Sequence, residues 1–338
     1  MKSVRYSLFF IVLLGLTTNC QQEPEIPYYT VEGEAQGTTY HITYSDNQER
    51  NFQSRLDSLF DRVNHSLSTY HEGSLINQFN QAMSLETEDP LFLDMIKQSG
   101  EVYRQSEGAF DTTVMPLVKA WGFGPEKEPE QRIENLDSLR QLVGFEHLKI
   151  GNGQIGKDRE GVQLDFNAIA QGYTVDLIAD FFEENGVENY MIELGGEVLT
   201  KGKNPRGRIW TLGIEQPLEI PGIQRLAAKV ELKNQALATS GSYRKFYVKD
   251  GVKYSHTIDP FLGHPVTHSL LSVSVVTDNC AKADAFATVF MVWGVEKSRA
   301  FISEHPELNL HAYFISASKG EGWEIEMTEG MEGILEEV

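Results

Sequence analysis

A predicted helix of almost entirely apolar residues contains the first pair of side chains that could do chemistry. Asp284 and Thr288 are four residues apart in AKADAFATVFMVWG (281–294), so both point from one face of that helix. Burying a carboxylate among apolar neighbours is costly unless it has a partner. A hard cation such as Mg2+ would be a suitable partner, because it prefers carboxylate and hydroxyl oxygens. The pattern equally allows Asp284 to face solvent or to cap a neighbouring loop, as structural carboxylates do.

A second candidate lies where a predicted strand meets a helix. The segment LDFNAIAQGYTVD (164–176) places Asp165 at the end of the strand, just before the helix begins. Free amides at a helix start attract anionic groups, notably phosphates. In isolation, the simpler interpretation is that Asp165 lies near the helix N-cap and has no further role.

A third candidate is a segment rich in histidine, YSHTIDPFLGHPV (254–266). It contains His256, which could act as a base near neutral pH, and Asp259 three residues later. Zinc binding by His256, His264 and His268 is disfavoured, because their spacing matches no zinc pattern and no cysteine joins them.

Three glycine-containing segments could form close approaches or turns. ELGGEV (193–198) and ALATSGSYRKF (236–246) interrupt strand patterns with small residues, which would let a ligand approach or simply form turns. GNGQIG (151–156) fits a dinucleotide-binding pattern literally, but the residues after it lead to a strand and not to a helix. We therefore predict a turn between two strands there.

These candidates must be positioned by helices and strands that alternate irregularly along the chain. Alternation of Tyr40, Ile42 and Tyr44 with polar residues indicates a half-buried strand, and the apolar spacing over 52–67 indicates a helix. Further strands are predicted at 162–166, 190–194, 208–214, 245–248 and 270–277, and further helices at 92–108, 168–185 and 279–293. This irregular order indicates an α+β fold, and we expect one compact domain over 28–335.

The composition allows a large core but argues against nucleic acid as a partner. The chain has 338 residues, of which 41% are hydrophobic. That is ample for one large domain. It carries 49 acidic and 29 basic side chains, a net charge of −20. Nucleic acid binding needs clustered Lys and Arg, so this balance disfavours it.

The first twenty residues have the features of an export signal. Lys2 and Arg5 precede LFFIVLLGL (8–16), an apolar run too short to cross a bilayer as a mature helix. Small polar residues and then Cys20 follow, which resembles a bacterial lipoprotein signal. Asn19 departs from that pattern, because Gly, Ala or Ser usually precedes the acylated cysteine.

We therefore predict a lipoprotein signal peptide over residues 1–19, acylation of Cys20, and a polar tether over 20–27. Acyl chains would hold the protein on a membrane. A plain secretory signal cleaved nearby is the alternative. Cys280 is the one other cysteine, so no intramolecular disulfide is expected, and its apolar surroundings predict an inert buried thiol.

Eight short segments match one protein family in order and spacing. They are QGTTYHI (36–42), STYHEGSLINQFN (68–80), GAFDTTVMPLVKAWGFG (108–124), LDFNAIAQGYTVD (164–176), MIELGGEV (191–198), ALATSGSYRKF (236–246), YSHTIDPFLGHPV (254–266) and ADAFAT (283–288). Together they resemble the FAD:protein FMN transferase (ApbE) family, of which a lipoprotein signal is also typical. The resemblance implies a single ApbE-like domain of mixed sheets and helices, which could divide into two subdomains around a flavin cleft.

The resemblance also implies an FAD site and a magnesium site assembled from these segments. By matched position, the FAD site would be lined by Gln36, Ser68, Thr69, Tyr70, Ala109, Phe110, Asp111, Asp165 and Gln171. Mg2+ would be held by Asp284, Thr288 and the backbone carbonyl of Ala168. Family members usually have Met in place of Gln36 and often Lys in place of Gln171, which predicts altered FAD contacts. The ALATSG, SHTIDP and ADAFAT segments are intact, so we expect activity to survive.

The implied reaction is Mg2+-dependent transfer of FMN from FAD to a Thr or Ser hydroxyl of an acceptor protein, with release of AMP. The base would be His256 supported by Asp259, or else Asp165. The implied acceptors are subunits of membrane electron-transfer complexes, and the anchored chain would face the periplasm. Two alternatives are an FAD pyrophosphatase that gives AMP and free FMN, and a non-catalytic FAD-binding lipoprotein.

Overall fold

The computed structural model describes residues 26–125, 135–151, 153–218, 225–243, 246–249, 252–320 and 322–336. The predicted signal peptide (1–19), Cys20 and most of the tether lie outside the described residues. Among the helices that can be described, none is both long and apolar enough to cross a membrane.

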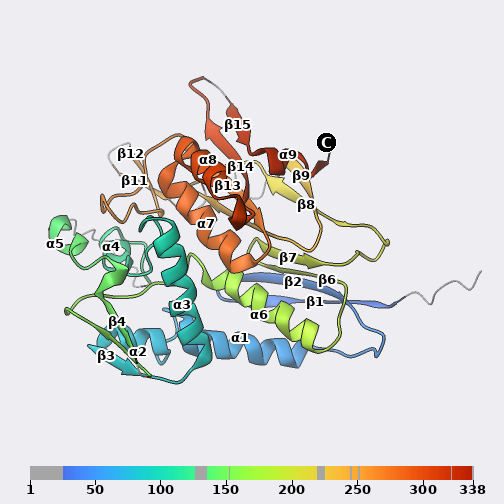
Figure 1. Cartoon of the computed structure of the whole chain (residues 1–338), viewed down its shortest axis with the longest axis horizontal. Coiled ribbons are helices and arrows are strands. Elements are labelled where there is room, and N and C mark those ends of the chain that lie inside the picture. The colour runs from blue at the N-terminus through green and yellow to red at the C-terminus, as the bar shows by residue number, and fades with distance from the viewer. Residues whose placement is uncertain are drawn as a thin grey trace, which may run out of the picture.

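An eight-stranded antiparallel sheet runs through the molecule (Figure 1). Its strands, in spatial order, are β1 (Tyr28–Ala35), β2 (Thr38–Ser45), β6 (Tyr190–Leu194), β7 (Glu197–Lys201), β10 (Ala236–Gly241), β13 (Leu270–Thr277), β14 (His311–Ala317) and β15 (Trp323–Met327). The strands predicted around Tyr40 and at 190–194 and 270–277 are thus confirmed. Together with the helices below, this sheet confirms the predicted α+β class.

Four long helices pack beside this sheet or on one another, and shorter helices lie between and after them along the chain. The long ones are α1 (Gln53–Leu67), α3 (Pro90–Gln105), α6 (Ala170–Glu184) and α7 (Cys280–Trp293). The shorter ones are α2 (Leu75–Gln81), α4 (Met115–Ala120), α5 (Leu136–Arg140), α8 (Val295–Glu304) and α9 (Glu329–Glu332), with 3-10 turns at Phe145–His147 and Pro306–Leu308. Figure 1 shows α6 and α7 side by side in the middle of the molecule, where they pack on β6, β7, β10 and β13.

Local sequence explains where these helices begin and end. The side chain of Asp89 accepts a hydrogen bond from the Phe92 amide at 2.8 Å, and Pro90 occupies the first turn of α3. Asn279 caps α7 in the same way through the Lys282 amide. Both residue types are preferred at helix starts because their side chains satisfy amides that the helix leaves free. Gly294, with a φ of 76°, ends α7.

Three smaller sheets complete the fold. They consist of β3 (Ser84–Glu86), β5 (Gln154–Lys157) and β4 (Leu148–Gly151); β16 (Leu335–Glu336), β9 (Leu226–Leu232) and β8 (Trp210–Glu215); and β11 (Phe246–Lys249) with β12 (Val252–Ser255). The predicted turn at 151–156 is confirmed, because β4 and β5 form a hairpin with Gly151 paired to Gln154.

The strand predicted at 162–166 is wrong. Only Gln163 forms a bridge, to Val114, and the rest of the segment belongs to no sheet. Its backbone is instead paired with a side chain: Asn80 Nδ2 donates to Leu164 O at 2.9 Å, and Leu164 N donates to Asn80 Oδ1 at 2.7 Å. The sequence pattern is that of an extended segment, but an amide side chain supplies the partner that a strand would have supplied.

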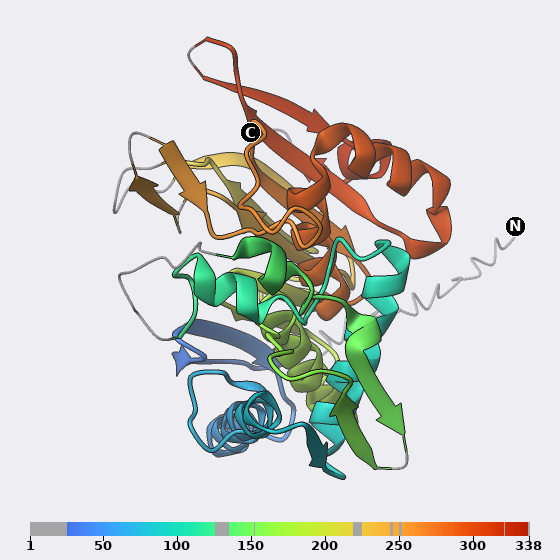
Figure 2. The same ribbon diagram turned by 90° about the vertical axis from the view of Figure 1, so that its left-hand side faces the viewer.

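Two large apolar clusters hold the layers together. One includes Phe92, Phe166 and Phe290, and the other includes Tyr44, Phe60 and Phe182. In Figure 2 the C-terminal segments, coloured orange and red, lie at the top, and the blue N-terminal ones lie at the bottom. Helices α6 and α7 contribute residues to both clusters and therefore connect them.

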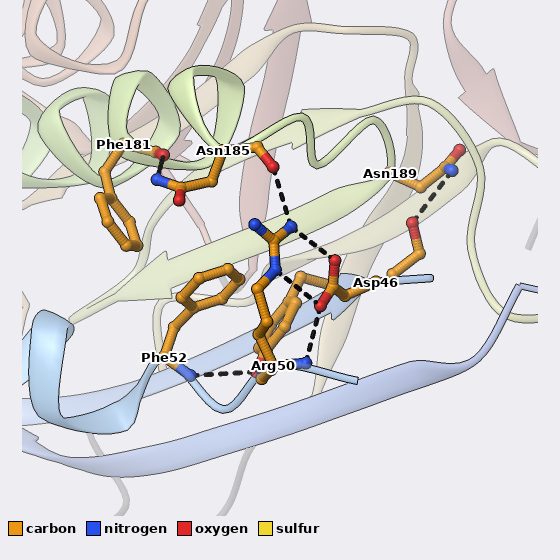
Figure 3. A network of polar contacts seen from close by, with 8 residues as sticks. Asp46, Arg50, Phe52, Phe181, Asn185 and Asn189 are labelled. Atoms are coloured by element: carbon orange, nitrogen blue, oxygen red, sulfur yellow. Dashed lines mark hydrogen bonds and ion pairs between the residues drawn. The ribbon is translucent and has the colours of Figure 1, made fainter. Parts of the chain in front are cut away.

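A charged contact fixes the loop between β2 and α1 (Figure 3). Asp46 is 4% exposed, and its carboxylate accepts hydrogen bonds from Arg50 Nη2 at 2.6 Å and Arg50 Nε at 3.0 Å. Arg50 Nη2 also donates to Asn185 O at 2.8 Å, just after the C-terminal end of α6. The Arg50 hydrogen bonds hold the pKa of Asp46 below its usual range. This contact therefore ties the N-terminal strands to α6.

Replacing Asp46 with Asn is expected to lower the free energy of unfolding by about 2 kcal/mol at neutral pH, because charged hydrogen bonds are lost. The pKa of Asp46 is lower in the folded protein than in the unfolded chain, where it is about 3.9. The stability that the ionised carboxylate adds is therefore fully present above about pH 3.9 and is lost as the pH falls through the pKa of the folded state. Urea denaturation of the parent and the variant at neutral pH and at about pH 2 measures the difference in stability at each pH. Asp57→Asn, at an exposed position on α1, is the control and should change stability little. An equal effect of Asp46→Asn at both pH values would contradict this account.

Candidate functional site

Helices α6 and α7 touch at a glycine. A Cβ atom on Gly172 would lie 2.7 Å from the carbonyl carbon of Cys280 and 2.9 Å from Ala281 Cα. Such contacts are too close for any other residue, so Gly172 is what allows the two backbones to meet. The start of α6, with the segment before it, is thereby brought against the start of α7.

Polar contacts connect the two helices in opposite order along the chain. Asp176 Oδ1 and Oδ2 accept hydrogen bonds from the amides of Cys280 and Ala281, both at 2.8 Å. The next contact is between Gly172, four residues before Asp176, and Asp284, four residues after Cys280: the Gly172 amide donates to Asp284 Oδ2 at 3.2 Å. One further step of the same size leads to Ala168 on one side and Thr288 on the other. These are the two residues that sequence analysis placed with Asp284.

Asp284 is a buried carboxylate, as one of the two interpretations of the sequence required. It is 6% exposed, and burial raises its pKa to about 7, although the Gly172 amide opposes the shift. Asp176 raises it further by repulsion. One turn later, the Thr288 hydroxyl lies 3.3 Å from Ser240 Oγ on β10. A partner of positive charge would relieve the cost of ionising Asp284 in this position.

The backbone carbonyl of Ala168, four residues before Gly172, is an unused acceptor. In an α-helix the Gly172 amide would donate to this oxygen, but here it donates to Asp284. Across the described part of the chain, Ala168 O accepts no hydrogen bond. A carboxylate, a hydroxyl and an unused carbonyl form the kind of all-oxygen donor set that suits Mg2+. No group of three His, Cys, Asp or Glu side chains that could hold a metal occurs in the described residues, so a cation here would rely on one carboxylate and neutral oxygens.

Asp165 lies beside the segment that contains Ala109, Phe110 and Asp111. Its amide donates to Thr112 O at 2.7 Å, while Asn80 holds the preceding residue as described above. Its carboxylate accepts a hydrogen bond from the Asn167 amide at 2.9 Å and is largely buried. The structure thus brings Asp165 and the 109–112 segment together, and their contact with FAD stays a prediction.

The three residues of that segment do not all present side chains to a ligand. Ala109 and Phe110 are buried in the apolar core, so contact with FAD from these two positions would be through the backbone. Asp111 Oδ1 accepts hydrogen bonds from the Thr113 amide at 2.8 Å and the Thr113 hydroxyl at 2.6 Å. Burial raises the pKa of Asp111 to about 6, against the effect of these bonds.

The predicted contributors Ser68, Thr69 and Tyr70 follow directly after α1. Thr69 Oγ1 is buried and has no hydrogen-bond partner among the described residues, which indicates that a ligand or water fills the role. Tyr70 is 66% exposed, and local desolvation and then the charge of Asp165 raise its pKa. Asp165 is near enough to Tyr70 for its charge to act on the phenol, so the two predicted FAD-binding segments lie near each other.

Both glutamines that depart from the family pattern are close to the first turns of α6: Gln171 belongs to that helix, and Gln36 reaches it from the turn between β1 and β2. Gln36 has a left-handed φ of 51°, and its Nε2 donates to Thr174 Oγ1 at 2.7 Å. Gln171 Nε2 lies 2.9 Å from where a Cβ atom on Gly195 would be. The turn between β1 and β2 and the turn between β6 and β7 therefore meet α6 next to Gly172.

The segment with His256 packs on the segment 108–124, and the side chain of Asp259 is engaged with backbone amides of its own turn. His256 forms an edge contact with Phe123, and Trp121 Nε1 donates to Gly263 O at 2.7 Å. Asp259 Oδ1 accepts hydrogen bonds from the amides of Phe261 at 2.8 Å and Leu262 at 3.0 Å, and so fixes the turn. Its hydrogen bonds with described residues stay within this turn, so a catalytic role for His256 or Asp259 remains a prediction.

Two residues that hold backbone segments of the site were not predicted from the sequence. Asn80 pairs with the backbone beside Asp165, and Asp176 holds the start of α7. A signal for Asp176 was present, because Ala168, Gly172 and Asp176 repeat the four-residue spacing of Cys280, Asp284 and Thr288. That Cys280 is a buried thiol is confirmed, and burial raises its pKa.

Comparison with known proteins agrees with this geometry. The model of the ApbE family matches residues 36–314. A Vibrio cholerae relative named "FAD:protein FMN transferase" is 37% identical over 306 residues, which are 88% of this chain and 90% of the relative. An Escherichia coli relative of the same name is 31% identical over 314 residues, 88% of this chain and 87% of the relative.

Two solved structures have the same fold. The flavin transferase ApbE from Vibrio cholerae superposes with a TM-score of 0.81 at 34% identity, over 92% of this chain and 100% of the other. The apo form of the Pseudomonas stutzeri flavinyl transferase ApbE superposes with a TM-score of 0.81 at 30% identity, over 91% of this chain and 97% of the other. With the family model covering most of the chain and relatives matched over nearly their whole length, this protein belongs to the ApbE family.

Proposed function

We propose that this protein transfers FMN from FAD to a Thr or Ser hydroxyl of an acceptor protein and releases AMP. The observation that carries the proposal is the contact between α6 and α7, where the Gly172 amide donates to the buried carboxylate of Asp284 and leaves the carbonyl of Ala168 unused. Together with the hydroxyl of Thr288, one turn after Asp284, these oxygens are the proposed ligands. Membership of the ApbE family and the names of the relatives support FAD as the substrate and a protein as the acceptor.

The three oxygens would hold Mg2+, which suits an all-oxygen donor set. Bound there, the cation would neutralise charge on the FAD pyrophosphate and make AMP a better leaving group. The ionised form of Asp284 is costly in this buried position, so its negative charge favours binding of a cation. A purely structural carboxylate would be expected to have a protein cation or several amides as partners, whereas Asp284 has one amide at 3.2 Å.

In the proposed reaction, the acceptor hydroxyl oxygen forms a bond to the FMN phosphorus as the bond from that phosphorus to the bridging oxygen breaks. The bridging oxygen leaves with AMP, and the hydroxyl proton passes to a base. Asp165 and His256 are the two candidate bases, and both lie on segments that pack against residues 108–124. Thr69, whose buried hydroxyl has no hydrogen-bond partner among the described residues, would orient FAD by hydrogen bonds, as would Gln171 on α6 and Gln36, which reaches α6 from the turn after β1.

The acceptor and the location are also part of the proposal. The export signal predicted over 1–19 and acylation of Cys20 would place the enzyme on a membrane, facing the periplasm. The acceptor would then be a subunit of a membrane electron-transfer complex with its modified hydroxyl on the same side. The negative charge of the chain disfavours nucleic acid as a further partner.

Loss of the metal ligands should remove catalysis without unfolding the protein. Asp284→Asn is expected to lower the rate of AMP release from FAD by about 100-fold or more, and Thr288→Val by about tenfold with partial recovery at high Mg2+. The unfolding midpoint of Asp284→Asn without Mg2+ should equal or exceed that of the parent, because a buried charge is gone. Asp180→Asn, at an exposed position on α6, is the control and should retain full activity. AMP release by Asp284→Asn at the parental rate would refute the metal assignment.

Transfer to protein and transfer to water give different products. With FAD, Mg2+ and an acceptor domain offering a Thr, we expect flavin fluorescence that survives a denaturing gel, an FMN adduct on that Thr by mass spectrometry, and equimolar AMP. An acceptor with Thr→Val is the control and should remain unlabelled. Free FMN with AMP and no label would identify a pyrophosphatase, and bound FAD with no AMP would identify a storage protein.

Acylation can be tested with the two cysteines of the sequence. Cys20→Ala should move the full-length protein from the membrane fraction to the soluble fraction of the cell, because the acyl chains are its proposed anchor. Cys280→Ala, at the buried thiol, should leave the protein on the membrane. Fractionation followed by immunoblotting measures this, and a Cys20→Ala protein that stays on the membrane would count against the anchor.

A further inference from the structure

Asp176 is an acidic residue of the helix pair to which neither the sequence nor the proposed reaction assigns a role. It lies on α6, and its two carboxylate oxygens each accept one amide of the first turn of α7, from Cys280 and Ala281, at 2.8 Å. The next amide of α7, that of Lys282, is satisfied by the helix's own cap, Asn279. The start of α7 is therefore held by two side chains, of which Asp176 is the one that belongs to the other helix.

The contact between the two helices needs such a restraint. They meet at Gly172, which has no side chain to interlock with α7. A shift of one residue along a helix is about 1.5 Å. Mg2+ demands oxygen distances of about 2.0–2.1 Å with near-ideal geometry. A displacement smaller than one residue would therefore separate donors on α7 from a donor at the start of α6.

We infer that Asp176 is a positioning residue that fixes α7 against α6, so that Asp284 and Thr288 meet the carbonyl of Ala168. This inference rests on the metal site of the proposed function. It follows from the order of the contacts: Asp176 restrains Cys280 and Ala281, Gly172 donates to Asp284, and the next step of the same spacing reaches Ala168 and Thr288. Asp176 would touch neither the cation nor FAD and would act through the placement of α7.

The test measures binding of Mn2+ alone to the full-length protein by electron paramagnetic resonance, because Mn2+ shares the preference of Mg2+ for oxygen ligands. Asp176→Asn is expected to weaken Mn2+ binding by about tenfold or more, as loss of an outer support of a metal site does. The amide nitrogen of Asn would oppose one of the two α7 amides, so the paired hydrogen bonds cannot both form. Asn279→Ala is the matched control: it removes the other cap from the same end of α7 without altering a contact to α6, and should keep the parental affinity.

Comparison of affinity with the unfolding midpoint separates positioning from simple stabilisation. Equal loss of Mn2+ affinity in Asp176→Asn and Asn279→Ala, or no loss in either, would overturn the inference. Asp284→Asn is the reference variant: if it still binds Mn2+ like the parent, the metal site itself is misassigned. If it loses binding while Asp176→Asn does not, only the positioning role fails.

A second variant covers the case in which Asp176→Asn does not fold. Asp176→Glu keeps both acceptor oxygens but places them one methylene farther from α6. We expect it to fold, with an unfolding midpoint near that of the parent, and yet to bind Mn2+ several-fold more weakly. Parental Mn2+ affinity in Asp176→Glu would show that the position of α7 does not depend on this side chain.

Discussion

The contact between α6 and α7 is the constraint on which the site depends. Gly172 lets the two backbones touch, and the same residue turns its amide from Ala168 toward Asp284. This change of hydrogen-bond partner has two consequences. The buried carboxylate of Asp284 gains an amide donor, and the carbonyl of Ala168 is left without the donor that a regular helix would provide. In an apolar interior both outcomes are unfavourable without a further partner, and a hard cation would satisfy both.

The other parts of the site are arranged around the start of α6. The turn after β1 reaches it through Gln36, the turn after β6 reaches it through Gly195, and the segment before it carries Asp165. Asn80 holds that segment with two hydrogen bonds to its backbone, so Asp165 is placed without a neighbouring strand. The site is thus built from turns and extended segments held by side chains, on a rigid pair of helices.

Asp111 and Asp284 are buried carboxylates of this region, and burial raises the pKa of both. Each is costly to the fold when ionised, and each breaks the rule that such groups lie at the surface. Groups of this kind are common at functional sites, where local stability is given up for chemistry. The Asp46–Arg50 contact is of the opposite kind, because its cation holds the carboxylate ionised and supports the fold.

The sequence by itself determined the local features: the helices at 52–67 and 279–293, the strand around Tyr40, the turn at 151–156, and the pairing of Asp284 with Thr288 on one helix face. Hydrophobic spacing and capping residues act over a few positions, so these could be read directly. Only the tertiary structure decided that Asp284 is buried, that Ala168 keeps a free carbonyl, and that Asp176 holds the start of α7. These depend on contacts between residues more than a hundred positions apart, and no local pattern records which distant backbone a side chain will meet.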